Sequence, residues 1–123
     1  MENRETAMQY MLLIYEPEEH YANASEAFLT EIVGKHMALS AELREAGQLV
    51  SGDGLQGVET ATTVVTDASG GQSLHDGPFA ETKEQLGGYY LIDVPDLDAA
   101  LAWAKRMPVV PGGKVEVRPV MIY

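Results

Sequence analysis

The 123-residue sequence contains no cysteine. This absence excludes disulfide bonds, thiolate metal ligands and a cysteine nucleophile. Long apolar runs are also missing, so the sequence predicts no membrane-spanning segment. Only 8 Lys and Arg stand against 19 Asp and Glu, and the formal net charge of −11 disfavours direct binding to nucleic acid. The three histidines show no ligand spacing and no strong cofactor motif is present, so we expect neither a metal nor a cofactor.

The length and composition fit one globular domain. A chain of 123 residues can enclose a single core, and 46% of them are hydrophobic. Residues 1–7 are charged and polar without an apolar segment, so we expect a disordered leader rather than a secretory signal. The domain is then expected over residues 8–123, and a cytoplasmic location is the default expectation.

Short runs rich in apolar and β-branched residues predict the strands. The predicted strands cover residues 8–15, 48–51, 61–66, 72–75, 87–94 and 114–120. The strands at 8–15 and 87–94 are apolar on both faces, which is typical of strands covered on both sides. Because the helices of so small a domain cannot cover both faces of a sheet, this pattern predicts a homodimer related by a two-fold axis.

Two amphipathic segments predict helices between these strands. The first begins near Ser25, with Asn23 or Ser25 as its N-cap, and ends at Gly47. Its apolar stripe consists of Phe28, Ile32, Leu39, Leu43 and Ala46. His36 falls on the same stripe, so its ring is expected to point toward the sheet or a cleft edge.

The second helix is predicted to begin at its cap Asp96 and to stop at Pro108. The side chains expected on its buried face are Leu97, Ala100, Leu101, Ala104 and Met107. The resulting order is β-α-β-β-α-β with an inserted β-hairpin. This order matches an α+β fold of the ferredoxin-like, split βαβ type.

Residues 52–57 formally match the dinucleotide-binding spacing G-x-G-x-x-G. That fingerprint needs a strand before it and a helix after it. Here a predicted helix precedes the glycines, and the β-branched stretch 60–66 follows them. We therefore interpret residues 52–57 as a flexible turn.

The most distinctive stretch of the chain runs from His75 to Tyr90. It begins with turn residues at 76–78, continues through a polar loop, and ends on Gly87 and Gly88 at the start of a strand. The two glycines allow close approach of a ligand or a partner backbone. Connections of this kind often carry function, although a well-formed surface turn is the simpler alternative.

These segments together resemble a known family. The apolar strand 10–15, the motif run 76–84, the Gly-Gly-Tyr-Tyr sequence at 87–90 and the strand 115–119 are similar to those of the YCII-related proteins. The resemblance is to the branch named for its Asp-Gly-Pro-Phe motif, residues 76–79 here, and it extends from Met8 to Val120. It implies a ferredoxin-like domain that forms a dimeric α+β barrel.

The resemblance also implies two functions. Members of the wider superfamily isomerise or oxidise aromatic and lactone substrates, and one YCII-like lineage eliminates HCl from a chlorinated hydroquinone. The first hypothesis is therefore a cofactor-free lyase or isomerase that acts on a small aromatic or lactone-like molecule. Members of this branch are often encoded beside extracytoplasmic-function sigma factors. The second hypothesis is a non-catalytic ligand-binding or regulatory module that partners such a sigma factor.

Carried over to this sequence, the His–Asp pair of YCII-like proteins corresponds to His36 and Asp76. A histidine held by a carboxylate is a general acid or base suited to neutral pH. The simpler alternatives are a partly buried histidine bonded to a backbone carbonyl and an Asx-turn aspartate. His75 is a weaker candidate than His36, because neighbouring side chains at a strand end point apart.

Five further residues are candidates for substrate binding: Phe79, Lys83, Tyr89, Tyr90 and Arg118. Phe79 either lines the mouth of a cleft or anchors the turn in the core. Tyr89 and Tyr90 alternate along a strand, so at most one of them faces a pocket. Lys83 and Arg118 suit a substrate carboxylate, with solvated surface charges as the alternative.

Overall fold

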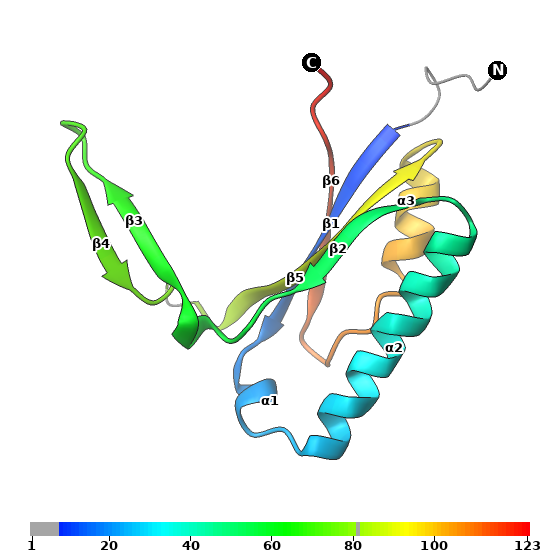
Figure 1. Ribbon diagram of the computed structural model, residues 1–123, viewed down its shortest axis with the longest axis horizontal. Coiled ribbons are helices and arrows are strands. Elements are labelled where there is room, and N and C mark those ends of the chain that lie inside the picture. Colours follow the sequence, from blue (N-terminus) through cyan, green and yellow to red (C-terminus); the bar gives the residue numbers. More distant parts are fainter. Residues whose placement is uncertain (1–7, 81) are drawn as a thin grey trace.

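Four antiparallel strands in the order β2-β5-β1-β6 form the main sheet (Figure 1). The strands are β1 (Met8–Pro17), β2 (Leu49–Gly54), β5 (Glu84–Val94) and β6 (Lys114–Pro119). The computed structural model describes residues 8–80 and 82–123, so the leader expected at 1–7 lies outside the described residues. The strand order is that of a ferredoxin-like split βαβ fold, which confirms the predicted α+β class.

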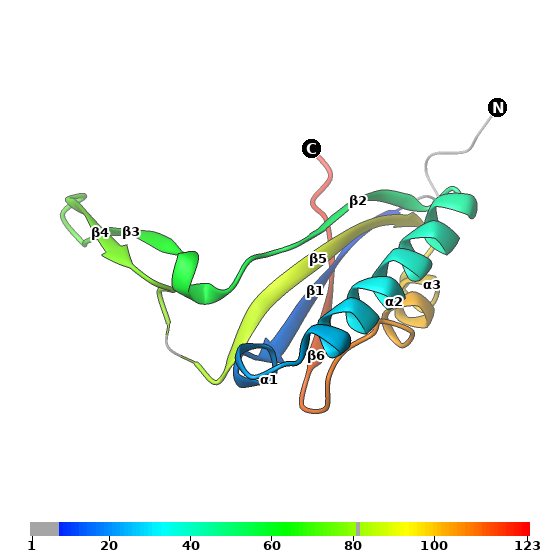
Figure 2. The same ribbon diagram turned by 60° about the horizontal axis from the view of Figure 1, so that its bottom comes forward.

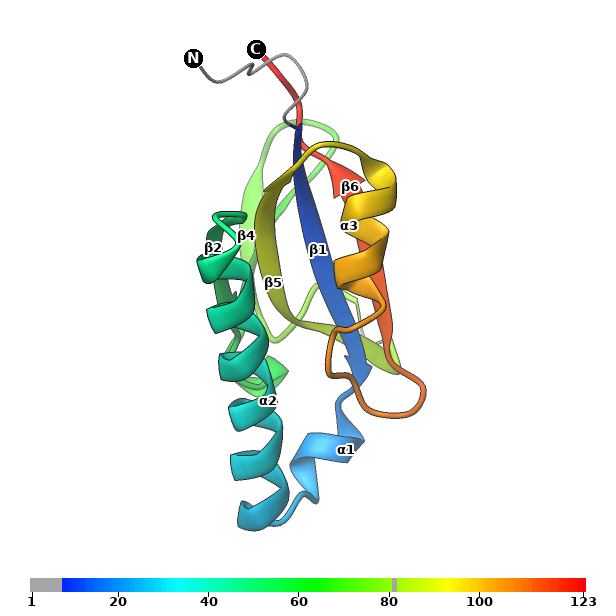
Figure 3. The same cartoon turned by 90° about the vertical axis from the view of Figure 1, so that its right-hand side faces the viewer.

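Two helices cover one face of this sheet, α2 (Glu26–Glu45) and α3 (Leu97–Ala104), as Figures 2 and 3 show. A short helix, α1 (Glu19–Ala22), leads from β1 to α2. The Ser25 hydroxyl accepts a hydrogen bond from the Phe28 N–H at 3.1 Å, and Gly47 follows the helix with φ +73°. The Asp96 carboxylate accepts one from the Ala99 N–H at 2.9 Å. The predicted N-cap and C-terminal glycine of α2 and the cap of α3 are therefore confirmed.

The hydrophobic core lies between the main sheet and these helices. Alternate side chains of the two central strands enter it together with residues of the helices and the loop after α3: Tyr10, Leu12, Ile14, Tyr90, Ile92, Val94, Leu39, Leu43, Ala100 and Met107. Burial of each large side chain contributes about 1.5–3 kcal/mol. The other face of the sheet carries Met11, Leu13 and Leu91, which are only half-buried, and no helix or strand of the described residues covers this face (Figure 2).

The buried face of α3 differs from the prediction. Leu97 and Leu101 are 47% and 36% exposed, whereas Ala99 and Trp103 pack against the core. The Trp103 Nε1–H donates a hydrogen bond to the Gln48 Oε1 at 2.8 Å. The helix has only eight residues and several are alanine. Two neighbouring faces of the helix are therefore almost equally apolar, and the sequence pattern does not decide which of them is buried. The large indole, which buries more surface than leucine, determines the rotation.

A second sheet of two strands projects from the body of the molecule (Figures 1 and 2). It consists of β3 (Thr62–Thr66) and β4 (Gln72–Asp76), joined by a turn at 67–71, and we call residues 61–77 the arm. A short 3-10 helix, η1 (Val58–Thr60), precedes it. Val64 and Leu74 face each other across the arm and remain 58% and 75% exposed. The arm therefore buries little apolar surface and depends mainly on its backbone ladder.

The glycines at Gly52–Gly54 lie in β2 and pair with β5, so the flexible turn predicted there is wrong for this part of the stretch. A Cβ on Gly52 would lie 3.0 Å from the Tyr89 carbonyl oxygen, and a Cβ on Gly88 would lie 3.0 Å from that of Asp53. The glycines therefore permit close strand packing rather than a bend. The sequence predicted a turn here because a glycine that permits close strand packing cannot be distinguished, by its identity alone, from a glycine in a turn.

We expect Gly88→Ala to destabilise the fold. The added methyl group would meet backbone atoms of Asp53 and Gly54 at 3.0 and 3.3 Å, and these atoms move only if β2 shifts away from β5. The free energy of unfolding, measured by urea denaturation, should fall by about 1–3 kcal/mol. Gly54→Ala is the matched control, because its Cβ meets nothing within 4 Å and should change stability by no more than about 0.5 kcal/mol. Equal losses in both variants would contradict the close approach.

Candidate functional site

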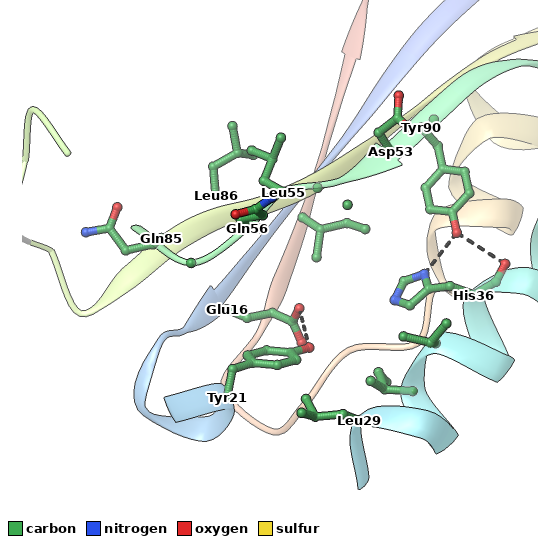
Figure 4. A pocket seen from close by; sticks show the side chains of 18 of the residues that line it. Glu16, Tyr21, Leu29, His36, Asp53, Leu55, Gln56, Gln85, Leu86 and Tyr90 are labelled. Carbon is green, nitrogen blue, oxygen red and sulfur yellow. Dashed lines mark hydrogen bonds between the residues drawn. The ribbon is translucent and has the colours of Figure 1, made fainter. Parts of the chain in front are cut away.

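A pocket of about 640 Å³ lies along α2, from Leu29 to Arg44 (Figure 4). Its other walls come from α1, the adjoining ends of β1 and β5, and the segment that continues from β2. Apolar side chains make up much of the wall: Ile14, Leu29, Ile32, Val33, Met37, Leu55 and Leu86. The volume and the apolar wall are typical of a small-molecule site.

His36 and Tyr90 meet at one end of this pocket. The His36 Nδ1 lies 2.9 Å from the Tyr90 Oη, and the two rings are stacked with their centroids 5.9 Å apart. The Ser40 hydroxyl donates to the same Tyr90 oxygen at 3.4 Å, and the Tyr90 hydroxyl donates to the His36 carbonyl oxygen at 3.4 Å. Three groups from two residues thus converge on one phenolic oxygen: the ring nitrogen and the carbonyl oxygen of His36, and the hydroxyl of Ser40. We call His36, Ser40 and Tyr90 the histidine station.

The 2.9 Å contact between the His36 Nδ1 and the Tyr90 Oη allows either group to donate, and the imidazole tautomer decides which. When the ring is protonated on Nδ1, it donates to the phenol and its Nε2 carries the lone pair. When the ring is protonated on Nε2, the phenol donates to Nδ1, and the Nε2–H is available to the Pro108 carbonyl, whose hydrogen bond raises the pKa of His36. In both tautomers Tyr90 holds the Nδ1 side of the ring, and the Nε2 side lies toward the cavity (Figure 4).

The surroundings of the histidine station keep its imidazole neutral. Burial lowers the pKa of His36 below its ordinary value, and the Glu16 charge and the Pro108 carbonyl oppose this shift only in part. Burial also raises the pKa of Tyr90, so its hydroxyl stays protonated at neutral pH. At pH 7 the site therefore holds a neutral base and a neutral hydrogen-bonding phenol.

Glu16 forms a second polar position in the same pocket with Tyr21. The Tyr21 hydroxyl donates to the Glu16 Oε1 at 2.8 Å, and the Val110 N–H donates to the Oε2 at 2.9 Å (Figure 4). The glutamate side of this pair is deeply buried, with a residue exposure of 6%. Burial, and then the hydrogen bond to Glu16, raise the pKa of Tyr21, so its hydroxyl remains a donor. We call Glu16 and Tyr21 the glutamate station.

The residues predicted from the sequence lie in different parts of the molecule. His36 and Tyr90 both line the pocket, whereas Asp76 is exposed at the end of β4 and does not. The arm that carries Asp76 projects away from α2 (Figures 1 and 2), so one chain does not bring the two members of the predicted pair into one cavity. Phe79 follows the arm and is 86% exposed, so it does not anchor the turn in the core.

The remaining predicted residues also lie outside the pocket. Tyr89 is half-buried on the opposite face of the sheet from Tyr90, and its hydroxyl donates to the Asp53 Oδ2 at 3.3 Å. Lys83 is exposed in the loop before β5, and Arg118 is exposed on β6 opposite Met11. The expectation that at most one of the two tyrosines faces a pocket agrees with this placement.

The glutamate station was missed in the sequence, although one signal for it exists. Residues 10, 12 and 14 of β1 are buried on the helix side, and Glu16 continues the same alternation. A charged residue in register with a buried face is unusual and marks a functional or structural role. The sequence analysis ended the strand at residue 15 and so assigned Glu16 to a loop.

No helix in 8–80 or 82–123 combines the length and apolar character needed to cross a membrane. Over the same ranges, no three His, Asp or Glu side chains are grouped closely enough to hold a metal ion.

The strand order and the pocket define a small ferredoxin-like α+β domain with a ligand-sized site beside its first long helix. The chain belongs to the YCII-related family, because the YCII-related domain matches residues 8–122. It is also 36% identical over 119 residues to the uncharacterized protein R00369 of Rhizobium meliloti (strain 1021), an alignment that covers 94% of each chain.

We expect His36 to make stability depend on pH. Its folded pKa is lowered, so the unfolded chain takes up the proton first as the pH falls below about 6.5. The contribution is intact above that pH and is lost as the pH falls through the folded pKa. In urea denaturation between about pH 7 and 5, His36→Gln should lose less stability than the wild type. His20→Gln, at an exposed histidine, is the control, and an unchanged slope in His36→Gln would contradict the assignment.

Proposed function

We propose that the pocket binds a small, largely apolar molecule and that His36 acts on it as a cofactor-free general base and acid. The observation that supports this most is the His36 imidazole, which lines a cavity of about 640 Å³ while its Nδ1 lies 2.9 Å from the Tyr90 hydroxyl. The proposed base is the tautomer with its proton on Nδ1, in which Nε2 carries the lone pair. The apolar wall suits the aromatic or lactone-like ring that the family resemblance implies. A neutral imidazole with a lowered pKa is free to accept a proton at pH 7.

The chemistry follows from one proton transfer. The Nε2 lone pair removes a proton from a C–H or O–H of the bound molecule, and the electron pair of that bond forms a new double bond. In an isomerisation the imidazolium returns the proton to another atom of the molecule. In an elimination the leaving group departs with its bonding electrons, and the imidazolium later releases its proton. The Glu16 charge and the Pro108 carbonyl stabilise the imidazolium, since both raise the pKa of His36.

Tyr90 serves in this proposal as the group that orients His36, the role expected of Asp76. A phenol holds the Nδ1–H without adding a negative charge, so it does not raise the pKa as a carboxylate would. Asp76 would join a pocket of this kind only through the arm of another chain. We therefore propose the dyad of His36 and Asp76 only between two copies of the chain, with His36 from one copy and Asp76 from the other.

We also propose that two copies pack through the uncovered faces of their main sheets. The half-buried Met11, Leu13 and Leu91 form an apolar strip along β1 and β5, with Glu116 and Arg118 beside it on β6. Such a strip with a polar border is typical of a homodimer interface. The homodimer expected from the two-sided apolar strands is supported by the same residues.

The catalytic proposal is tested by turnover of probe molecules. A chlorinated hydroquinone and a γ-lactone are incubated with the protein, and chloride release and proton NMR spectra are followed. We expect His36→Gln to lower the rate about 10²–10⁴-fold, because general acid–base catalysis contributes this much. Tyr90→Phe should lower the rate less and shift its pH profile, since the ring stays but the Nδ1 loses its partner.

Three controls separate the possible arrangements. Tyr89→Phe removes a hydroxyl from the neighbouring tyrosine outside the pocket and should leave the rate unchanged. A loss in Asp76→Asn as large as in His36→Gln would favour the dyad between chains over Tyr90. Binding of probes without turnover, together with capture of an extracytoplasmic-function sigma factor by the full chain, would favour the regulatory alternative.

The dimer proposal is tested by sedimentation at micromolar concentration. We expect a dimer for the wild type and a monomer for Leu13→Glu, because the new carboxylate would lie opposite Glu116 in the apolar strip. Leu97→Glu, at an exposed leucine on the covering helix α3, should stay dimeric. A monomeric wild type would contradict the proposal.

A further inference from the structure

Glu16 is a buried carboxylate to which the acid–base proposal gives no contact with the bound molecule. It lines the pocket, its residue exposure is 6%, and each of its oxygens accepts one hydrogen bond. Each carboxylate oxygen has two lone pairs, so acceptor capacity remains after Tyr21 and Val110 have donated. No Lys or Arg in residues 8–80 and 82–123 forms an ion pair with it. A buried negative charge of this kind is costly unless a positive group comes to meet it.

The rest of the pocket also favours a positive ligand. Glu16 and Glu18 line it, against one guanidinium from Arg44, and the whole chain carries a formal charge of −11. Glu18 is already engaged, because its Oε1 accepts a hydrogen bond from the Val58 N–H at 3.3 Å. A carboxylate or phosphate on the ligand would be repelled by this wall, whereas an ammonium group would be attracted.

The two stations occupy different places along the same cavity. Figure 4 shows the glutamate station on the α1 side and the histidine station on the α2 side, with Leu29 near the wall between them. A molecule that reaches both stations must carry its polar groups at two ends of an apolar body. The two polar positions therefore impose one binding orientation on such a ligand.

We infer that Glu16 is the recognition group for a primary ammonium on a small ligand with an apolar body. The ammonium donates to the free lone pairs of the carboxylate, the apolar body lies along Ile14 and Ile32, and the reacting end lies at the His36 Nε2. The inference rests on the proposed function in that it assigns the substrate class of the same pocket. Substrates of this class are small amines, and acidic analogues are excluded by the same carboxylate.

Three probes of similar size test the inference by isothermal titration: 2-phenylethylamine, the neutral 2-phenylethanol and the acidic 3-phenylpropionate. A charge-assisted hydrogen bond is worth about 1.5–3 kcal/mol, so we expect the amine to bind at least about tenfold more tightly than the alcohol. The acid should bind more weakly than both. Glu16→Gln should remove the preference for the amine, and His36→Gln should keep it.

Two further variants keep the test decisive. Glu18→Gln changes another carboxylate of the pocket wall and should keep the preference. An equal loss of the preference in this variant would assign it to the overall negative potential of the pocket and overturn the inference. If Glu16→Gln does not fold, Tyr21→Phe decides, because it removes one donor from the carboxylate and keeps the ring. Amine affinity should then rise relative to alcohol affinity, and an unchanged ratio would overturn the inference.

The outcomes also separate this inference from the proposed function. Equal affinity of the wild type for all three probes would overturn the role of Glu16 and leave the pocket as a small-molecule site. Binding of none of them would overturn it as well, and turnover of the hydroquinone or lactone would then still test the histidine station by itself.

Discussion

The antiparallel pairing of β1 with β5 determines where the chemistry of this protein lies. In this ladder Leu12 is opposite Tyr90 and Glu16 is opposite Gln85, with one irregularity between Ile14 and Tyr15. Because side chains alternate along a strand, this register sends Tyr90 and Glu16 to the side that the helices cover. A slip of one residue would turn the phenol and the carboxylate to the open face, and the same slip would expose the core.

The helix α2 divides into a part that stabilises the fold and a part that shapes the pocket. Leu39 and Leu43, in its C-terminal half, are buried against the sheet. Leu29, Val33 and Met37 in the preceding turns are 38%, 55% and 68% exposed and line the cavity. His36 lies where the two parts meet, so its backbone is held by the packed half while its ring borders the open half. This position explains how an imidazole can be both oriented and accessible.

Local features of the fold were readable in the sequence. The caps Ser25 and Asp96 and the terminal Gly47 depend on the chemistry of one turn, and periodic apolar residues determined most strands. His36 was placed on the correct stripe because a helical period suffices for that. Tyr90 was restricted to one face, but the choice between Tyr90 and Tyr89 depends on which face the helices cover.

Features that depend on tertiary arrangement were not readable. The direction of the arm, and hence the position of Asp76 and Phe79, depends on how far β2 stays paired with β5 through residues 52–54. The glycines there resemble turn residues in the sequence, and only the cross-strand contacts explain them. Glu16 was missed because a charge at a strand end resembles the start of a loop until the burial of its neighbours is known.

The arm also influences which parts of the domain unfold first. Directly after β2, the Leu55 N–H donates a hydrogen bond to the Gly87 carbonyl of β5 at 2.8 Å. The chain then continues into β3 and β4. The arm's own base is closed by the Gly77 N–H to Ala61 carbonyl bond of 2.7 Å and by the Thr63 hydroxyl on the Gly77 carbonyl at 2.8 Å. Because the arm buries little surface of its own, it can unfold locally as a separate unit while the core stays folded. We therefore expect its amide hydrogens to exchange with solvent through sub-global openings, and those of β1 and β5 to exchange on global unfolding.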